Sequence, residues 1–495
     1  MTTDHANKSR ARAFIGPATA LLYRARTRIP IDAQRLGLTT VALAFSGGTT
    51  LLFTLVLVHV LPPTSYGGIA RTFSLGMAVA QLSMAGIAPA IAREVAHGRD
   101  EYQRFSRARG GLAALAYCCG AVSLLYFPLA FAGLGPTNRL SLLLGWSLAF
   151  IYATYFGLKL ILFALNLSAR YAALELTSDA VFFATLILLA LLAPTAGLLT
   201  FSVAYAFFIV LATRLIYHRS SSIERLPIDR RILTYTGWSS VATYTSVARY
   251  AVAVAITGAL VGSVTAGRLA AVLAICAPFF LIPQAAAMLT FADVARARAS
   301  TSDPGRPVRI MCQVSALVSA LVIPSCCLFA PEIVRILLGP SYRSAVSSFV
   351  VVAICSTPQI ACLAVGQALA AQGAVRLNAF IGIVGFAVIV LGTVLLVSSH
   401  GLLGGAIAVG VSQATTGLVI LLVGHARYSI GPRQLAGSAF AVVVGIVAVM
   451  CNGAPLAARI GGELVVLGGI AYISWRTKWR PFATQGDAQT PAAAL

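Results

Sequence analysis

The sequence predicts an all-α protein that crosses a membrane about fourteen times, as two parallel six-helix lobes plus two extra C-terminal helices. Hydrophobic residues make up 59% of its 495 positions and charged residues only 10%. Apolar runs of about 20 residues recur along the chain, which is the length that crosses a hydrocarbon core about 30 Å thick. Arginine recurs in alternate loops between these runs. A polytopic helical membrane protein explains all three observations.

Fourteen apolar runs are the expected membrane helices, and no loop between them is long enough for a soluble domain. The predicted spans are 36–61, 67–92, 112–134, 140–165, 172–193, 197–217, 232–262, 265–291, 310–330, 346–371, 375–398, 401–424, 434–452 and 458–475.

The basic residues predict that both ends of the chain lie in the cytoplasm. With a cytoplasmic N-terminus, and with residues within three positions of a span end counted in the adjoining loop, the two tails and the even-numbered loops hold 28 of the 36 basic residues. Five lie on the opposite face and three within spans. This bias follows the positive-inside rule. It accounts for most of the formal net charge of +22 without a nucleic acid or another polyanionic partner.

The two tails are expected to be cytoplasmic, and the cysteines are expected to be structural. Residues 1–35 hold seven basic residues and act either as an orientation signal or as a contact to anionic lipid. Residues 476–495 form the other tail. All nine cysteines fall within predicted spans, where a free cysteine behaves as a small apolar residue. We therefore expect no disulfide, no metal and no cofactor.

The two halves of the chain resemble each other. The segment Leu134–Arg139 reappears as Leu338–Arg343, 204 residues later, in the corresponding predicted external loop. Because six helices separate equivalent points, both halves enter the membrane from the same side, which makes a parallel repeat. We predict an N-lobe at 36–217, a cytoplasmic linker at 218–231, a C-lobe at 232–424, and helices 13 and 14 within 434–475. Such a layout is typical of transporters whose substrate pathway runs between the lobes.

Two oppositely charged residues are expected to meet inside the N-lobe. An ionisable group at membrane depth is costly and needs a partner, water or a function. Lys159 and Asp179 each lie about ten residues from the turn near Ala169, so an antiparallel hairpin places them at one depth. We predict an ion pair between them. A proton or cation relay that includes Glu175 is the alternative.

Arginines without an acidic neighbour in sequence are the candidate anion contacts. Arg249 lies near the middle of its span, Arg71 about one turn inside an outer helix end, and Arg268 at an outer helix start. Guanidinium matches phosphate oxygens with paired donors and stays charged. Arg71 has the alternative of extending to the outer surface. Hydroxyl residues that precede Arg249 are expected to line a polar cavity: Ser239, Thr243 and Ser246.

The sequence lacks the motifs that are typical of an enzyme or of an ATP-driven transporter. The three lysines are Lys8, Lys159 and Lys478, and none ends a Gly-x-x-x-x-Gly-Lys-Ser/Thr loop. No His/Glu or Cys/His cluster indicates a catalytic metal, and no large catalytic loop is present. We therefore expect a protein that is not an enzyme.

Five motifs in order resemble one transporter family. Residues 61–70, 86–94, 336–342, 371–376 and 401–408 are similar to the loops and helix ends of the polysaccharide-transporter (O-antigen flippase) branch of the multidrug/oligosaccharidyl-lipid/polysaccharide exporter (MOP) superfamily. The resemblance covers about 36–425. Pro62-Pro63 departs from the family, which has Gly after the leucine, and this bears on loop shape only.

The resemblance implies a flippase of the bacterial cytoplasmic membrane. It would move an undecaprenyl-diphosphate-linked oligosaccharide from the inner to the outer leaflet, by alternating access, for cell-surface polysaccharide synthesis. Polysaccharide polymerase or glycosyltransferases are possible partners. The driving force would be an ion gradient or consumption of the product outside. Three alternatives stay open: a lipid II flippase, an ion-coupled multidrug or metabolite exporter, and a non-transporting scaffold of a polysaccharide-export complex.

Overall fold

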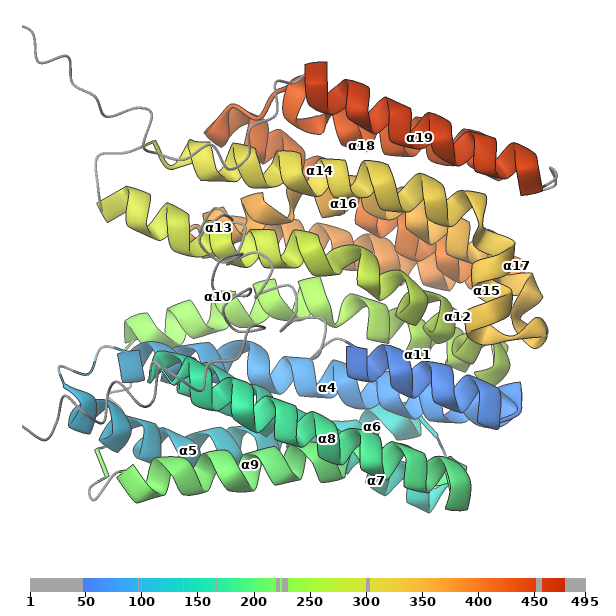
Figure 1. Cartoon of the computed structure of the whole chain (residues 1–495). Coiled ribbons are helices and arrows are strands. Elements are labelled where there is room, and N and C mark those ends of the chain that lie inside the picture. The colour runs from blue at the N-terminus through green and yellow to red at the C-terminus, as the bar shows by residue number, and fades with distance from the viewer. Residues whose placement is uncertain are drawn as a thin grey trace, which may run out of the picture.

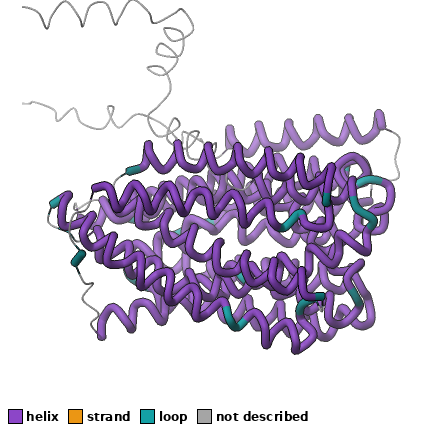
Figure 2. Tube along the Cα trace, turned by 90° about the horizontal axis from the view of Figure 1, so that it is seen from below, coloured by secondary structure: helices purple, strands orange, loops and turns teal. Residues whose placement is uncertain are grey.

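The computed structural model is an all-helical bundle, as predicted (Figure 2). It describes residues 48–96, 98, 100–136, 138–165, 167–219, 223–224, 230–299, 303–450 and 456–476. Within this part, ten helices are long and apolar enough to cross a membrane, or eleven if one bent pair is a single span.

The helices of the first half follow a helix whose described part covers residues 48–60. They are α4 (Pro63–Ala96), α5 (Glu101–Ser123), α6 (Tyr126–Leu129), the π-helix η1 (Ala130–Leu134), α7 (Arg139–Ala164), α8 (Ser168–Leu192), the 3-10 helix η2 (Pro194–Ala196) and α9 (Leu199–Arg219).

Within the described chain, the second half contains more helices than the first. They are α10 (Arg230–Val247), α11 (Arg249–Val261), α12 (Ser263–Cys276), η3 (Ala277–Phe280), α13 (Leu281–Ala299), α14 (Gly305–Leu328), α15 (Ala330–Leu338), η4 (Pro340–Ala345), α16 (Val346–Ala371), α17 (Val375–Tyr428), α18 (Pro432–Met450) and α19 (Leu456–Arg476).

The structure is consistent with the predicted fourteen helices once two features are considered. Helix α17 has 54 residues and covers two predicted spans, which meet at Gly401 with φ 53° and ψ −126°. An L side chain rarely adopts this backbone conformation, so glycine marks the turn between the two spans. Two shorter apolar helices, Gly48–Val60 and Gly461–Ile473, correspond to the first and last predicted spans.

The two halves of the chain lie on opposite sides of the bundle. In Figure 1, helices α4 to α9 form the lower part, α13 to α19 form the upper part, and α10 to α12 lie between them. Aromatic side chains fill the core of the first half. The ring centroids of Phe53 and Phe201 lie 4.7 Å apart in an edge-to-face arrangement, and those of Phe182 and Phe201 lie 4.9 Å apart. The exact lobe boundaries remain predictions.

The predicted span 232–262 is not one straight helix. Its two parts, Gly237–Val247 and Arg249–Val261, are bent by 56°. In the turn before the bend, the Thr245 hydroxyl donates to the Val241 carbonyl and the Ser246 hydroxyl to the Ala242 carbonyl, both at 2.6 Å. Such bonds to the carbonyl four residues back bend helices. The hydroxyl-rich sequence therefore explains the bend.

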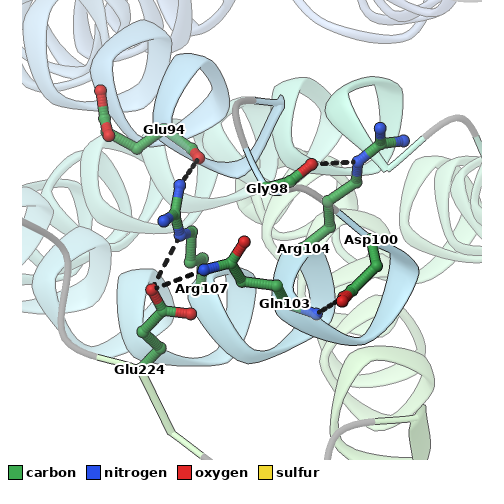
Figure 3. A network of polar contacts seen from close by, with 7 residues as sticks. All are labelled: Glu94, Gly98, Asp100, Gln103, Arg104, Arg107 and Glu224. Carbon is green, nitrogen blue, oxygen red and sulfur yellow. Dashed lines mark hydrogen bonds and ion pairs between the residues drawn. The ribbon is translucent and has the colours of Figure 1, made fainter.

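The segment after α9 is attached to the first half (Figure 3). The Glu224 carboxylate accepts hydrogen bonds from Arg107 at 3.1 Å and from the Gln103 amide at 3.2 Å. The Arg107 guanidinium also donates to the Glu94 carbonyl at 3.2 Å. These contacts join α5, the end of α4 and part of the predicted linker, so Glu224 is positioned by the N-terminal half.

The last helix, α19, is attached to α14 and α15 by charged and polar contacts. The Arg459 guanidinium donates to both Glu332 carboxylate oxygens at 2.8 Å. One turn further, the Ser325 hydroxyl donates to Glu463 at 2.7 Å. The two helices outside the predicted repeat therefore pack on the second half (Figure 1).

Candidate functional site: a cavity between the two halves

A cavity of about 370 Å³ lies between the two halves. The first half contributes residues of the 48–60 helix and α4, and the second half contributes the last residue of α10 and residues of α11, α12, η3, α13, α16 and α17. This volume lies within the range of about 300–1,000 Å³ that is common for small-molecule sites. A ligand in this cavity is positioned to contact both halves at once.

The cavity lining is mostly apolar and aromatic, with a few polar side chains and no charged ones. None of the described lining residues is Asp, Glu, Lys, Arg or His. The polar and aromatic lining residues are Thr50, Phe53, Thr54, Tyr66, Phe73, Ser74, Gln81, Tyr250, Phe280, Gln284 and Gln413. Hydroxyls and amides offer hydrogen bonds to neutral polar groups, while the rings cover apolar faces. The lining is therefore suited to an uncharged ligand group that presents apolar faces together with a few hydrogen-bonding groups.

Close backbone packing joins the halves at the predicted external ends of α4 and α12. A Cβ atom on Gly67 would overlap the Ser263 carbonyl, and one on Gly267 would overlap the Gly67 backbone. Only glycine allows this approach of the two helices. The halves are therefore in direct contact beyond Tyr66, which lines the cavity at this end.

Arg249 lies behind the cavity wall and not in it. Its side chain is 1% exposed and is among the largest fully buried side chains in the described part of the chain. It donates to the Thr416 hydroxyl and to the Tyr250 hydroxyl, both at 2.9 Å, and its Nε has no hydrogen-bond partner among the described residues. From the sequence we expect Arg249 to line the pathway, whereas the structure places it behind the wall of this cavity.

Tyr250 connects Arg249 to the cavity. Its hydroxyl accepts from Arg249, donates to the Gln359 amide oxygen at 3.3 Å, and accepts from the Gln413 amide at 3.2 Å. Tyr250 and Gln413 both line the cavity. The arginine therefore acts on the cavity through one hydrogen bond.

The other two candidate arginines also lie outside the described lining. Arg71 donates to the carbonyls of Gly133 and Leu134, the latter at 3.1 Å, at the C-terminal end of η1. A cation is favourable at this end of a helix, so these contacts give Arg71 a structural role at the predicted external end of the bundle. Arg268, on α12, has a buried Nε without a hydrogen-bond partner among the described residues. Binding of an anion by either residue remains a prediction.

The predicted polar wall is displaced by the bend. Three predicted wall residues lie on α10: Ser239, Thr243 and Ser246. None of them lines the cavity of about 370 Å³, and the first residue of this part of the chain that does so is Val247. Ser246 is exposed, but its hydroxyl already donates to the Ala242 carbonyl. Hydroxyl groups on this helix therefore contribute to its shape rather than to the cavity lining.

Lys159 pairs with Glu175 and not with Asp179. The Lys159 ammonium lies 3.0 Å from the Glu175 carboxylate. The prediction was wrong because it placed the turn near Ala169, whereas α7 ends at Ala164 and α8 begins at Ser168. The turn therefore lies nearer to Lys159, and its partner is one helical turn earlier on α8.

Tyrosine rings enclose this ion pair. The Tyr155 hydroxyl donates to Glu175 at 2.5 Å and lies 3.1 Å from the Lys159 ammonium. The ammonium also lies 4.9 Å from the Tyr155 ring and 5.2 Å from the Tyr171 ring. Asp179 is buried nearby, and its Oδ2 has no hydrogen-bond partner in the described chain. This cluster in the N-terminal half thus holds two carboxylates and one ammonium, and its role as a relay remains a prediction.

Sequence reasoning did not identify Tyr250, Gln81 and Gln413. The search followed ionisable side chains, and glutamine carries no charge. Glutamine inside an apolar span is nevertheless a signal, because its amide also needs hydrogen bonds in the membrane. Across the described ranges, no cluster of three or more His, Cys, Asp or Glu side chains is placed to hold a metal ion.

Comparison with known proteins shows the fold. No known family profile and no curated protein matches the sequence. The lipid II flippase MurJ in an inward closed conformation is 12% identical with a TM-score of 0.62, over 90% of this chain and 100% of that chain. An inward-facing multidrug resistance MATE family transporter of the MOP superfamily is 14% identical with a TM-score of 0.60, over 77% and 94%.

A third solved structure has the same fold. It is a MOP superfamily transporter from Pyrococcus furiosus, whose description reports a binding pocket of reversed polarity. It is 14% identical with a TM-score of 0.55, over 80% of this chain and 95% of that chain. The chain therefore has the fold shared by MATE-like transporters and lipid flippases.

Proposed function

We propose that this protein is a flippase that moves an undecaprenyl-diphosphate-linked oligosaccharide across the bacterial cytoplasmic membrane. Substrate passes from the inner to the outer leaflet by alternating access between the two lobes and supplies cell-surface polysaccharide synthesis. Polymerase and glycosyltransferases are the proposed partners. The single observation that supports this best is the uncharged cavity between the halves, with a buried guanidinium one hydrogen bond behind its wall.

The cavity chemistry favours a glycan lipid over a cationic drug. An exporter of organic cations requires a negative group at its site, and no carboxylate is among the described lining residues. Arg249 has no salt bridge among the described residues and adds a positive charge close to the cavity, which repels a cation and attracts a diphosphate. Lipid II flipping and scaffolding remain the alternatives, since the fold alone does not separate them.

The driving force is proposed to be an ion gradient or consumption of the product outside. The group of Lys159, Glu175 and Asp179 has one carboxylate more than it has basic groups. A carboxylate in excess at membrane depth is able to take up and release a proton or a cation. It is the proposed relay if an ion gradient is used.

Deletion of the gene, in cells without another flippase of this class, is expected to trap lipid-linked oligosaccharide on the inner leaflet. The measurement is extraction and analysis of lipid-linked intermediates, with the wild-type gene restored as the control. Export should return with the gene. If the deletion strain accumulates no intermediate and exports its glycan normally, the flippase proposal is wrong.

A further inference from the structure

Two glutamines line the cavity from opposite halves of the protein. Gln81 lies on α4, and Gln413 lies on α17. Their exposed fractions are 4% and 2%, and both Oε1 atoms are buried without a hydrogen-bond partner among the described residues. The great majority of buried polar atoms in native proteins have a partner. Two buried acceptors without a partner, on residues that line one cavity, therefore point to a ligand group that bonds them when it enters the cavity.

The orientation of Gln413 is fixed by the network behind it. Its Nε2 donates to the Tyr250 hydroxyl at 3.2 Å, and that hydroxyl also accepts from Arg249 at 2.9 Å. Because the amino end of the amide is held by Tyr250, the carbonyl end stays available as an acceptor. Arg249 thus acts as a positioning residue for Tyr250 and, through it, for Gln413.

The chemistry of the two acceptors selects the part of the ligand that they bind. An amide oxygen only accepts hydrogen bonds. An ionised diphosphate has no donor to offer, so it leaves both oxygens unsatisfied. Hydroxyl and acetamido groups of a sugar are donors and carry no charge, which agrees with the uncharged lining. The cavity has room for one or two sugar rings, beside the aromatic side chains Phe53, Phe73 and Phe280.

We propose that Gln81 and Gln413 form a sugar-hydroxyl site that recognises the first sugars of the lipid-linked glycan, an inference that rests on the proposed flippase function. Because one glutamine belongs to each half, the bound sugar links the two lobes. The diphosphate is not bound by the two amide oxygens. Recognition of the glycan is therefore separated from recognition of the anionic lipid part.

Binding by the full-length protein in lipid nanodiscs tests this site with two probes. One probe is undecaprenyl diphosphate, and the other is undecaprenyl diphosphate that carries a single N-acetylglucosamine. The wild type is expected to bind the sugar probe about tenfold more tightly, as one or two additional hydrogen bonds would produce. Gln81→Leu and Gln413→Leu should each remove most of this preference and leave the affinity for undecaprenyl diphosphate unchanged.

Matched controls separate loss of the site from loss of folding. Gln434→Leu removes an amide on α18 that bonds the Gly431 amide at 2.9 Å, outside the cavity, and should retain the preference. All variants should keep the wild-type thermal midpoint. Equal binding of both probes by the wild type, or an unchanged preference in both cavity variants, overturns the sugar site but not the flippase. Binding of neither probe by the wild type contradicts both proposals.

Discussion

Replacement of Arg249 with methionine is expected to leave the protein folded and to reduce glycan export by about tenfold or more. Methionine has a similar volume, and exchange of a buried charge for a well-packed apolar side chain is often neutral or stabilising. Tyr250 and Thr416, however, lose a charged donor at 2.9 Å. Hydrogen bonds to charged groups contribute about 1.5–3 kcal/mol. The measurement is export and inner-leaflet intermediate at matched protein level.

Two further variants make the Arg249 result specific. Arg249→Lys should restore export only in part, because an ammonium does not reproduce two separate guanidinium bonds. Tyr250→Phe retains the ring and Arg249 but removes the hydroxyl that joins Gln359 and Gln413, so it should also impair export. Normal export by Arg249→Met at the native protein level would show that this network has no role in transport.

Replacement of Lys159 with methionine is expected to have the largest effect on stability. It leaves the Glu175 carboxylate, whose side chain is 8% exposed, without its salt bridge. Loss of one partner of a buried pair costs about 3–5 kcal/mol. The amount of folded protein in the membrane and the thermal midpoint in detergent should both fall sharply.

The double variant Lys159→Met/Glu175→Gln supplies the control. It removes both charges, so it should recover most of the lost stability, whereas Asp179→Asn should cost much less than Lys159→Met because the direct salt bridge of Lys159 in the described chain is to Glu175, and Asp179 interacts with both groups only over a longer distance. A Lys159→Met protein as stable as the wild type would contradict the ion-pair account. Full stability of the double variant together with lost transport would support a relay.

The fold was predictable because its signals are repeated many times. Each span carries its own apolar run, and the arginine bias orients all of them together. The bend before Arg249 was not predicted, because the same hydroxyl groups fit a water-facing wall and bonds to the preceding turn. The structure shows the latter for Thr245 and Ser246. The sequence alone does not determine the direction in which a short side chain points.

The candidate site was predictable only in part. The depth and isolation of Arg249 follow from its position in a span, but its direction depends on the bend. The partner of Lys159 depends on a turn position, and an error of a few residues changes which carboxylate faces it. Gln81 and Gln413 lie far apart in the sequence, and only the packing of α4 against the second half brings them to one cavity.

The central claim, that this chain itself moves a lipid-linked glycan between leaflets, is tested most directly by reconstitution. Purified protein is placed in sealed liposomes that contain a labelled undecaprenyl-diphosphate-linked sugar, and the label is challenged with an impermeant quencher. With the wild type, label that was protected in the inner leaflet should become accessible with time, and with Arg249→Met it should become accessible about tenfold more slowly or not at all. Protection that persists with folded wild-type protein, under either direction of an imposed ion gradient, would contradict the account.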